Sequence, residues 1–488
     1  MEKDSHDTRE GEDDVNINTV TTRAIELCEP TPNEVKQITT IADQAMNLVT
    51  DYISSNPKIV EVVFGGSYAK GTWLKGDADI DIFVKMDLSV SIEDFERIGI
   101  EVGLHSLKKY KHYLRYSDHP YVEGFIDGVR VNVVPCYNVE KGKWKSAADR
   151  STFHTEYVRN NLDDLKKREV RLLKKFLKSI GVYGAEIGIA GFSGYVAEVL
   201  VLKYGSFEGV LRAISDIREK HIVSIDKEYD SDVVKGFQSV IVILDPVDAR
   251  RNLGAAISSE GVGKFVLASR AFLEAPSLSF FKDKDNDKDE KKNMRVQNKK
   301  SKSLYQNLLI VEFDYRQRSP DIIWGQLKRS LGAIITQLEM AGFTIIRATC
   351  NTDEKTSGAF LFLLESTVLP TYFQRRGPTV FRKEDAASFI KTSSSVKKAL
   401  ITWIDKDLRI TTLVKRKDTG AKDFLRSLLL TSRIENSGVT KGLVADLQAK
   451  AKRRGKRLQI YTANERRIKG IVQEAMHELT TTESRIFR

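Results

Sequence analysis

The chain has 488 residues, 41% of them hydrophobic, with 78 Lys and Arg against 67 Asp and Glu and a formal net charge of +11. This length predicts several domains with packed cores, and no apolar run reaches the roughly 18 residues of a membrane helix. The N-terminus is polar and has no signal-peptide pattern, and Cys28, Cys136 and Cys350 are too widely spaced for a disulfide framework or a zinc site. We therefore expect a cytoplasmic protein without membrane segments, and the basic charge favours a polyanionic partner.

Two segments are expected to lack packed structure. Residues 1–30 are polar and mostly acidic, which is typical of a disordered tail. Residues 282–303 are dense in Lys and Asp and have few apolar anchors, which predicts a flexible linker.

The first predicted helix begins after Thr31. Residues 31–34 offer a capping hydroxyl, a proline at the first helical position and the carboxylate of a capping box. Apolar residues then recur every three or four positions as far as Ile53, and Pro57 ends the pattern. Residues 59–64 are apolar and partly β-branched, so we expect a strand that leads into Gly65-Gly66-Ser67.

A glycine turn and two acids form the first candidate site. Gly66 permits a tight turn, and the Ser67 hydroxyl can point at phosphate oxygens, although such a turn is more often purely structural. Residues 79–82 alternate acidic and apolar, as a half-buried strand does, so Asp79 and Asp81 should share one face. Neighbouring carboxylates repel unless a cation lies between them, which favours a divalent metal over an exposed acidic strand.

This turn and the spaced acids resemble the signature of the DNA polymerase β-like nucleotidyltransferase superfamily. Residues 66–81 resemble the active-site segment of archaeal-type, class I CCA-adding enzymes, which are tRNA nucleotidyltransferases. Further blocks similar to that family follow in its order at residues 116–122, 133–137, 153–158, 171–178, 181–186, 191–195 and 244–252. The resemblance is strong over residues 60–275 and fainter beyond. It implies a multidomain α+β protein with a polymerase β-like nucleotidyltransferase head, a helical neck, a body and a tail.

The resemblance implies template-independent addition of C, C and A to the 3′ end of tRNA from CTP and ATP. Asp79 and Asp81 would ligate two Mg²⁺ ions that join the triphosphate to the RNA 3′-hydroxyl. The residues alone support only metal-dependent nucleotidyl transfer to a polyanionic acceptor. Two alternatives stay open: an enzyme that adds only A or oligoadenylate to other RNAs, and an RNA-binding protein with impaired catalysis.

Asn132 is the main departure from the family. It occupies the position, on the predicted strand 129–135, where the family has a third metal-binding and catalytic aspartate. An amide oxygen can bind a metal but carries no charge and takes no proton. Asp127 is not a substitute, because it belongs to the turn before this strand, roughly 16 Å away. Asn132 is either a natural variant or a carboxylate-to-amide substitution.

The resemblance also implies nucleotide-binding residues. One set would surround the triphosphate: Gly66, Ser67, Lys70, Lys174 and Tyr183. A second set would lie nearer the nucleotide or its phosphates: His119, His154 and Arg251. Without the resemblance, the two histidines would be surface or turn residues, and the lysines of residues 163–180 a solvated helix face. Asp245 is expected to brace Arg251.

The predicted domains are a head at residues 31–150, a neck at 151–281, a body at 304–318 plus 405–488, and a tail at 319–404. Strands are expected at 308–313, 343–348 and 359–365, with a helix from Ser319, and strands near 401–415 should pack on the body. The basic residues at 374–378 with 382–383 form either a structural loop or an edge that contacts the backbone of the tRNA elbow. The basic cluster at 450–457 is expected to contact RNA phosphates, and the expected partner is tRNA, through its acceptor stem and elbow. The sequence leaves a homodimer open.

Overall fold

The computed structural model describes residues 16–53, 56–116, 119–226, 229–282, 301–395, 399–448 and 458–487. The chain divides into two compact units, residues 1–293 with 483–488, and residues 294–482. Within the described ranges, every helix is too short or too polar to cross a membrane.

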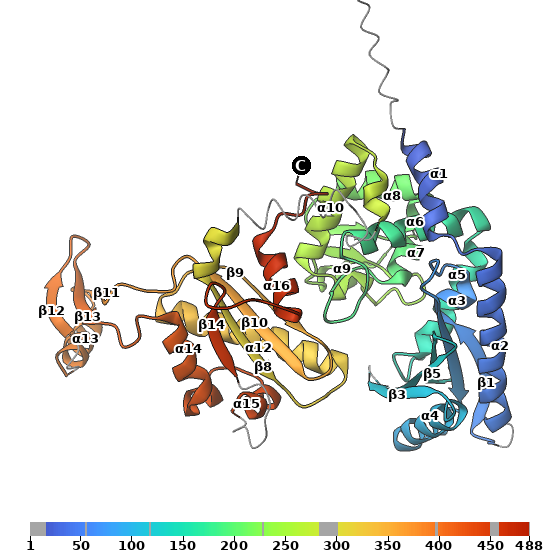
Figure 1. The fold of residues 1–488 in the computed structure, drawn as a ribbon, viewed down its shortest axis with the longest axis horizontal. Coiled ribbons are helices and arrows are strands. Elements are labelled where there is room, and N and C mark those ends of the chain that lie inside the picture. The colour runs from blue at the N-terminus through green and yellow to red at the C-terminus, as the bar shows by residue number, and fades with distance from the viewer. Residues whose placement is uncertain are drawn as a thin grey trace, which may run out of the picture. The chain divides into compact units, whose positions relative to one another are not determined.

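The first unit contains a five-stranded sheet of order β1-β2-β5-β4-β3 (Figure 1). Its strands are β1 Ile59–Gly65, β2 Asp79–Met86, β3 Lys111–Tyr116, β4 Pro120–Ile126 and β5 Val129–Tyr137. Strands β2 and β5 run parallel, and the other neighbours are antiparallel. Helices α2 Pro32–Ile53 and α4 Ile92–Ser106 pack on one face of the sheet, which leaves the other face for a site.

Several local predictions for this sheet are confirmed. The Thr31 hydroxyl accepts a hydrogen bond of 3.2 Å from the Glu34 N–H, which is one half of the predicted capping box. The Glu34 carboxylate accepts instead from the Gly76 N–H at 2.6 Å. Asp127 and Gly128 have φ of 48° and 82° and form the turn between β4 and β5. Asp127 therefore lies in the turn before β5, five residues from Asn132, and is not part of the strand that carries Asn132.

Residues 17–28 are a correction to the predicted disordered tail. They form helix α1 Ile17–Cys28, whose buried residues Val20, Ala24 and Cys28 join the hydrophobic core of the neck and pack on α6. A helix of this length is marginal in isolation, so its order comes from packing that local composition does not reveal. Residues 1–15 lie outside the described residues.

The neck is a helical layer that follows the sheet in the chain. Its main helices are α5 Asp149–Asn161, α6 Asp164–Ser179, α7 Gly194–Tyr204, α8 Phe207–Ser215 and α10 Ser259–Glu274. Two further strands, β6 His221–Val223 and β7 Ile241–Ile243, pair in parallel, and a short helix α9 Ser231–Lys235 separates them along the chain. The end of the chain returns to this layer, where Arg485 Nη1 donates to the carbonyl oxygens of Ser179 and Lys282, both at 3.0 Å.

The second unit has a four-stranded antiparallel sheet of order β14-β8-β10-β9. The strands are β8 Leu308–Asp314, β9 Ile345–Thr352, β10 Ser357–Leu364 and β14 Gln459–Thr462. Helices α12 Pro320–Ala341, α14 Ala421–Leu430 and α15 Lys441–Gln448 contribute to the core on one face, and α16 Ile471–Thr480 to the core on the other. The predicted strands and helix are thus present, in a three-layer arrangement.

A separate three-stranded sheet corrects the predicted boundary between tail and body. Strands β11 Tyr372–Thr379, β13 Arg409–Lys415 and β12 Ala399–Ile404 pair in that order, and α13 Lys383–Ser395 packs on β11 and β13. Strand β13 therefore pairs with β11 and β12, and not with the body. Strands β9 and β10 belong to the body sheet, and α12 packs on it. Strand order depends on tertiary pairing, which local patterns do not encode.

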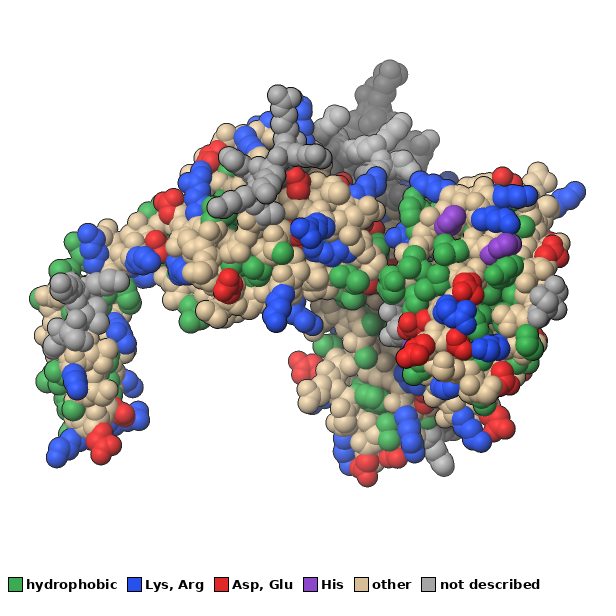
Figure 2. Space-filling model, turned by 90° about the horizontal axis from the view of Figure 1, so that it is seen from below, with side chains coloured by type: hydrophobic (Ala, Val, Ile, Leu, Met, Phe, Trp, Pro, Cys, Tyr) green, Lys and Arg blue, Asp and Glu red, His purple; other side chains and the backbone are tan. Residues whose placement is uncertain are grey.

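The three-stranded sheet has a mixed surface. It lies at the left of Figure 2, which shows hydrophobic and basic side chains beside one another. Tyr372 and Ile401 are exposed, and Arg376 forms ion pairs of 3.1 Å and 2.6 Å with Asp405 and Asp407. Part of the basic edge predicted at residues 374–376 is therefore neutralised within the sheet. The cluster at 450–457 and linker residues 283–300 lie outside the described residues, and residues 301–307 form a 3-10 helix.

Candidate active site

Asp79 and Asp81 project from the sheet face opposite α2 and α4. Ile80 and Ile82, between and after them, are fully buried in the core beneath those helices. The parallel pairing of β2 with β5 sets Asp81 directly beside Asn132, whose Nδ2 donates a hydrogen bond of 2.9 Å to Asp81 Oδ1. The predicted shared face of the two acids is confirmed, and Asn132 is their neighbour.

These residues fit a divalent metal. Burial raises the pKa of Asp79 to about 6 and also raises the pKa of Asp81, so both carboxylates lack full compensation for their charge. Asn132 Oδ1 is buried and accepts no hydrogen bond from the described residues. Carboxylate and amide oxygens suit a hard cation such as Mg²⁺. The described residues contain no group of three or more His, Cys, Asp or Glu placed to hold a metal, which agrees with an amide in the third position.

Gly66 brings the backbone of helix α3 Gly66–Lys70 against Asp81. Its φ is +62°, and a Cβ added there would lie 1.8 Å from Asp81 Oδ2. Neither the backbone conformation nor the space therefore admits a side chain. Ser67 is the next residue of α3 and therefore lies beside the contact between Gly66 and Asp81.

A buried cluster of Lys70, Thr72, Lys174 and Glu198, the lysine–glutamate cluster, joins α3, α6 and α7. Lys70 Nζ donates to Glu198 Oε2 at 2.8 Å, and Lys174 Nζ donates to Glu198 Oε1 at 3.0 Å. The Thr72 hydroxyl donates to Glu198 Oε1 at 2.6 Å and accepts from Lys174 at 3.0 Å. One carboxylate serves two ammonium groups, which leaves one positive charge in excess.

Electrostatics keep Glu198 ionised. Burial alone would raise the pKa of this carboxyl, but Lys174 and Lys70 lower it to about 2. Burial lowers the pKa of Lys174. Glu198 was missed by sequence reasoning, although a lone acid in the apolar run of α7 was a usable signal, because buried charges are paired.

Lys174 and Tyr183 lie together, but not as an open phosphate clamp. Lys174 is 1% exposed and uses its ammonium group inside the lysine–glutamate cluster. A Cβ at Gly194 would lie 3.0 Å from the Tyr183 hydroxyl and 3.3 Å from Lys174 Nζ, so both approach the start of α7. Burial raises the pKa of Tyr183, which stays protonated. The structure thus groups Lys70, Lys174 and Tyr183, with Lys174 enclosed.

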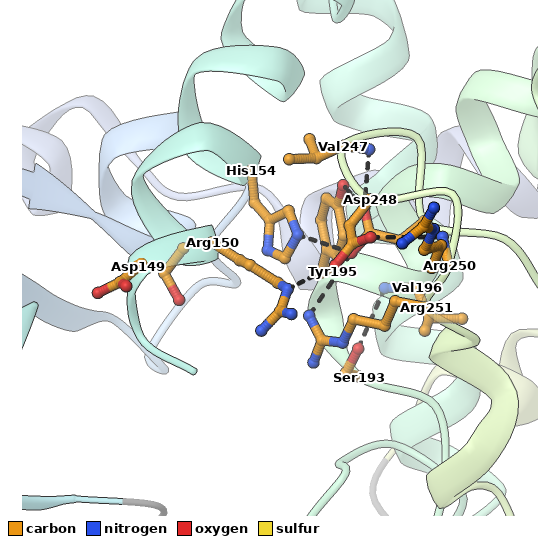
Figure 3. Close-up of polar contacts among 12 residues, drawn as sticks. Asp149, Arg150, His154, Ser193, Tyr195, Val196, Val247, Asp248, Arg250 and Arg251 are labelled. Atoms are coloured by element: carbon orange, nitrogen blue, oxygen red, sulfur yellow. Dashed lines mark hydrogen bonds and ion pairs between the residues drawn. The ribbon is translucent and has the colours of Figure 1, made fainter. Parts of the chain in front are cut away.

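His154 belongs to a second network with Tyr195 and Arg251 (Figure 3), and all three contact Asp245. His154 Nε2 lies 2.8 Å from Asp245 Oδ2, the Tyr195 hydroxyl donates to Asp245 Oδ1 at 3.1 Å, and Arg251 Nη1 donates to Asp245 Oδ2 at 3.5 Å. The His154 and Tyr195 rings stack with centroids 4.0 Å apart. The contact expected between Asp245 and Arg251 is present, and Arg251 keeps 44% of its side chain exposed.

Two residues of α5 pair with aspartates of the loop that carries Arg251. His154 pairs with Asp245, and Arg150, one helical turn earlier on α5, places its Nε 2.8 Å from Asp248 Oδ2. Burial lowers the pKa of His154, against the raising effect of Asp245, which favours the neutral ring. Lys70 Nζ lies 5.1 Å from the Tyr195 ring centroid, so this network adjoins the lysine–glutamate cluster.

His119 is not brought to the carboxylates. Its ring packs edge-on against Phe95 of α4, with centroids 5.2 Å apart, and its Nδ1 lies 3.6 Å from Glu96 Oε1. Phe95 is fully buried on the sheet face opposite Asp79 and Asp81. The expectation that His119 lies near the nucleotide has no geometric support, because it precedes β4 on the α4 side of the sheet.

Comparison with known proteins extends this picture. Models described as nucleotidyltransferase domain, tRNA nucleotidyltransferase second domain, and CCA-adding enzyme C-terminal domain match residues 46–158, 168–282 and 306–447. The CCA-adding enzyme of Methanothermobacter thermautotrophicus is 32% identical over 408 residues, 83% of this chain and 87% of that protein. The CCA-adding enzyme of Pyrobaculum neutrophilum is 37% identical over 376 residues, 75% of this chain and 83% of that protein.

Among solved structures, the Cid1 poly(U) polymerase is 17% identical, with a TM-score of 0.43 over 54% of this chain and 97% of that chain. A likeness this distant carries no argument about function. The two CCA-adding enzymes, from Methanothermobacter thermautotrophicus and Pyrobaculum neutrophilum, match most of the chain and are more than 30% identical to it. The chain therefore belongs to the family of CCA-adding enzymes, which are tRNA nucleotidyltransferases.

Proposed function

We propose that the chain adds C, C and A to tRNA 3′ ends from CTP and ATP without a template, and that the reaction takes place at Asp79 and Asp81. Family membership supports the activity and does not favour an A-only polymerase or a non-catalytic RNA-binding protein. The observation that carries the location is the row formed by Asp81 and Asn132, in which a buried amide oxygen has no partner among the described residues and lies beside a half-buried carboxylate.

Asp79, Asp81 and Asn132 would hold the divalent metal. When bound, a metal pair lowers the pKa of the attacking 3′-hydroxyl and stabilises the leaving pyrophosphate. The tRNA 3′-hydroxyl loses its proton to solvent, and its oxygen forms a bond to the α-phosphorus of the nucleotide. The bond from that phosphorus to the oxygen that bridges to the β-phosphorus breaks, and pyrophosphate leaves. Gly66 fixes the position of Asp81 from the other side, because its backbone lies against that carboxylate.

The lysine–glutamate cluster is our candidate for the triphosphate end of the site. Its excess positive charge is buried, where the attraction for an anion is least screened. Lys70 connects the cluster to the metal site, because its charge opposes the effect of burial on the pKa of Asp81. We expect Lys70 and Tyr183 to approach the phosphates, with Ser67 at the turn, and Lys174 to act from within the cluster. Arg251, half exposed beside Asp245, is the candidate for contact with the base.

Nucleotide addition to defined tRNAs tests the proposal. Transcripts that end before CCA, after C and after CC are incubated with Mg²⁺ and one labelled triphosphate at a time. We expect C on the first two substrates and A only on the third. Addition of A to all three would favour an A-adding polymerase, and binding without incorporation would favour the RNA-binding alternative.

Four finer expectations remain predictions. The number and identity of the metal ions would come from metal analysis and titration of the purified protein. A homodimer would show in light scattering as twice the mass of 55.2 kDa. A cytoplasmic location and contact with the tRNA acceptor stem and elbow follow from the proposed substrate and need fractionation and footprinting.

A further inference from the structure

Glu123 lies next to Asn132 on the site face of the head sheet. Strand β5 pairs in parallel with β2 through Asp81 and Asn132, and antiparallel with β4 through Asn132 and Glu123. Directly paired residues on neighbouring strands project to the same face, with their Cβ atoms about 5 Å apart. Asp81, Asn132 and Glu123 therefore form one row across three adjacent strands.

Glu123 is a buried charge held from one side only. Its residue is 6% exposed. Arg115 of β3 donates to it twice, from Nε at 3.0 Å and Nη2 at 2.6 Å, and both hydrogen bonds end on Oε1. Arginine often binds a carboxylate through both of its oxygens. Here the described contacts with Arg115 use one oxygen, so Oε2 retains its lone pairs.

The centre of the row lacks charge. Asn132 is neutral and its buried Oδ1 has no hydrogen-bond donor among the described residues. Glu123 is the carboxylate that follows in the row, on the same face and one strand further. Its charge lies in the same row as Asp81, because Asn132 pairs directly with both residues.

We propose that Glu123 is a positioning residue that supplies, from the adjacent strand, negative charge that Asn132 lacks, and so sets how strongly Asp79 and Asp81 hold a divalent metal. This inference rests on the proposed metal site of the preceding section. The competing explanation is that Glu123 only anchors the edge strand β3 through Arg115. If Glu123 supplies charge, replacing Glu123 and replacing Arg115 should change metal affinity in opposite directions. If the pair is only an anchor, the two replacements should have the same effect or none.

Binding of Mn²⁺ alone to the full-length protein, without tRNA or nucleotide, measures the effect directly. Isothermal titration calorimetry would compare the unmodified protein with Glu123→Gln and Arg115→Gln. Removing the acid should weaken Mn²⁺ binding by about tenfold, and removing the arginine should strengthen it, because the uncompensated carboxylate then acts on the site. A purely structural pair predicts that both substitutions leave affinity unchanged or weaken it together.

A double variant supplies the control. Asn132→Asp in the Glu123→Gln background should restore Mn²⁺ affinity to at least that of the unmodified protein, since the charge returns to the centre of the row. Unchanged affinity in Glu123→Gln would overturn the proposal. If Glu123→Gln does not fold, as judged by circular dichroism, Arg115→Gln decides: stronger Mn²⁺ binding supports the proposal, and equal or weaker binding overturns it.

The readout also separates this inference from the proposed activity. Failure of CCA addition with an intact opposite response of the two variants would contradict the function while leaving the role of Glu123 in metal binding. Normal CCA addition with no response of Mn²⁺ affinity would contradict the role of Glu123 alone.

Discussion

Replacing Glu198 should lower the unfolding free energy of the first unit. Glu198→Gln keeps the size of the side chain and a hydrogen bond to Thr72 but removes the charge that compensates Lys70 and Lys174. Glu198 is 1% exposed, so solvent cannot replace its contribution. Loss of one partner of a buried ion pair typically costs about 3–5 kcal/mol, because the other charge remains buried without compensation.

The pKa of Glu198 gives a second estimate of the magnitude. The lowering of this pKa from its ordinary value of 4.5 to about 2 corresponds to roughly 3 kcal/mol of stability at neutral pH, at about 1.4 kcal/mol per pKa unit. Because the pKa is lower in the folded state, this contribution is complete above the unfolded value of 4.5 and is lost as the pH falls from there towards 2. Glu198→Gln should lack that dependence.

Urea unfolding of the full chain at pH 7, followed by circular dichroism, measures the effect. We expect the transition of the first unit to lose about 3–5 kcal/mol in Glu198→Gln. Glu274→Gln, on an exposed position of α10 in the same unit, is the matched control and should stay within about 0.5 kcal/mol of the unmodified protein. If Glu198→Gln lowers the unfolding free energy by less than about 1 kcal/mol, the Glu198 charge does not stabilise the buried lysines as described.

Three further substitutions test the site. Asn132→Asp should raise nucleotide incorporation by about tenfold or more, because it restores a metal-binding charge, and equal rates would make that charge dispensable. Gly66→Ala should lower incorporation by about 100-fold, because its Cβ would displace Asp81, whereas Gly263→Ala in open space should not. The unfolding free energy should fall as the pH drops below 6.5, because burial lowers the pKa of His154 and favours its neutral form, and His154→Gln should reduce that slope; an equal slope in both proteins would contradict it.

Local patterns in the sequence predicted much of the head. The acid and apolar alternation of residues 79–82 was enough to put Asp79 and Asp81 on one face, since strand geometry allows no other arrangement. The position of Asn132 beside them, by contrast, came from the family resemblance, because pairing between distant strands leaves no local trace. Helix α1 was missed for the same reason: its order depends on packing against α6.

Side-chain partners were the least predictable part of the site. Lys174 was expected at the triphosphate from its place in a family block, yet the side chain is enclosed by Glu198, a partner 24 residues away. His119 fits a family block as well, but the start of β4 directs it to α4. Sequence blocks identify which residues matter, and only the packed structure shows which neighbour takes up their charge.

The length and sequence of the extension show whether this protein adds C, C and A at Asp79 and Asp81. A tRNA that lacks CCA is incubated with the protein, Mg²⁺, CTP and ATP together, and the 3′ ends are sequenced; Asp81→Asn, which removes a proposed metal ligand, is the control. We expect extension by C, C and A that stops there, and no extension with the variant. A longer A tract, or equal extension with Asp81→Asn, would contradict it.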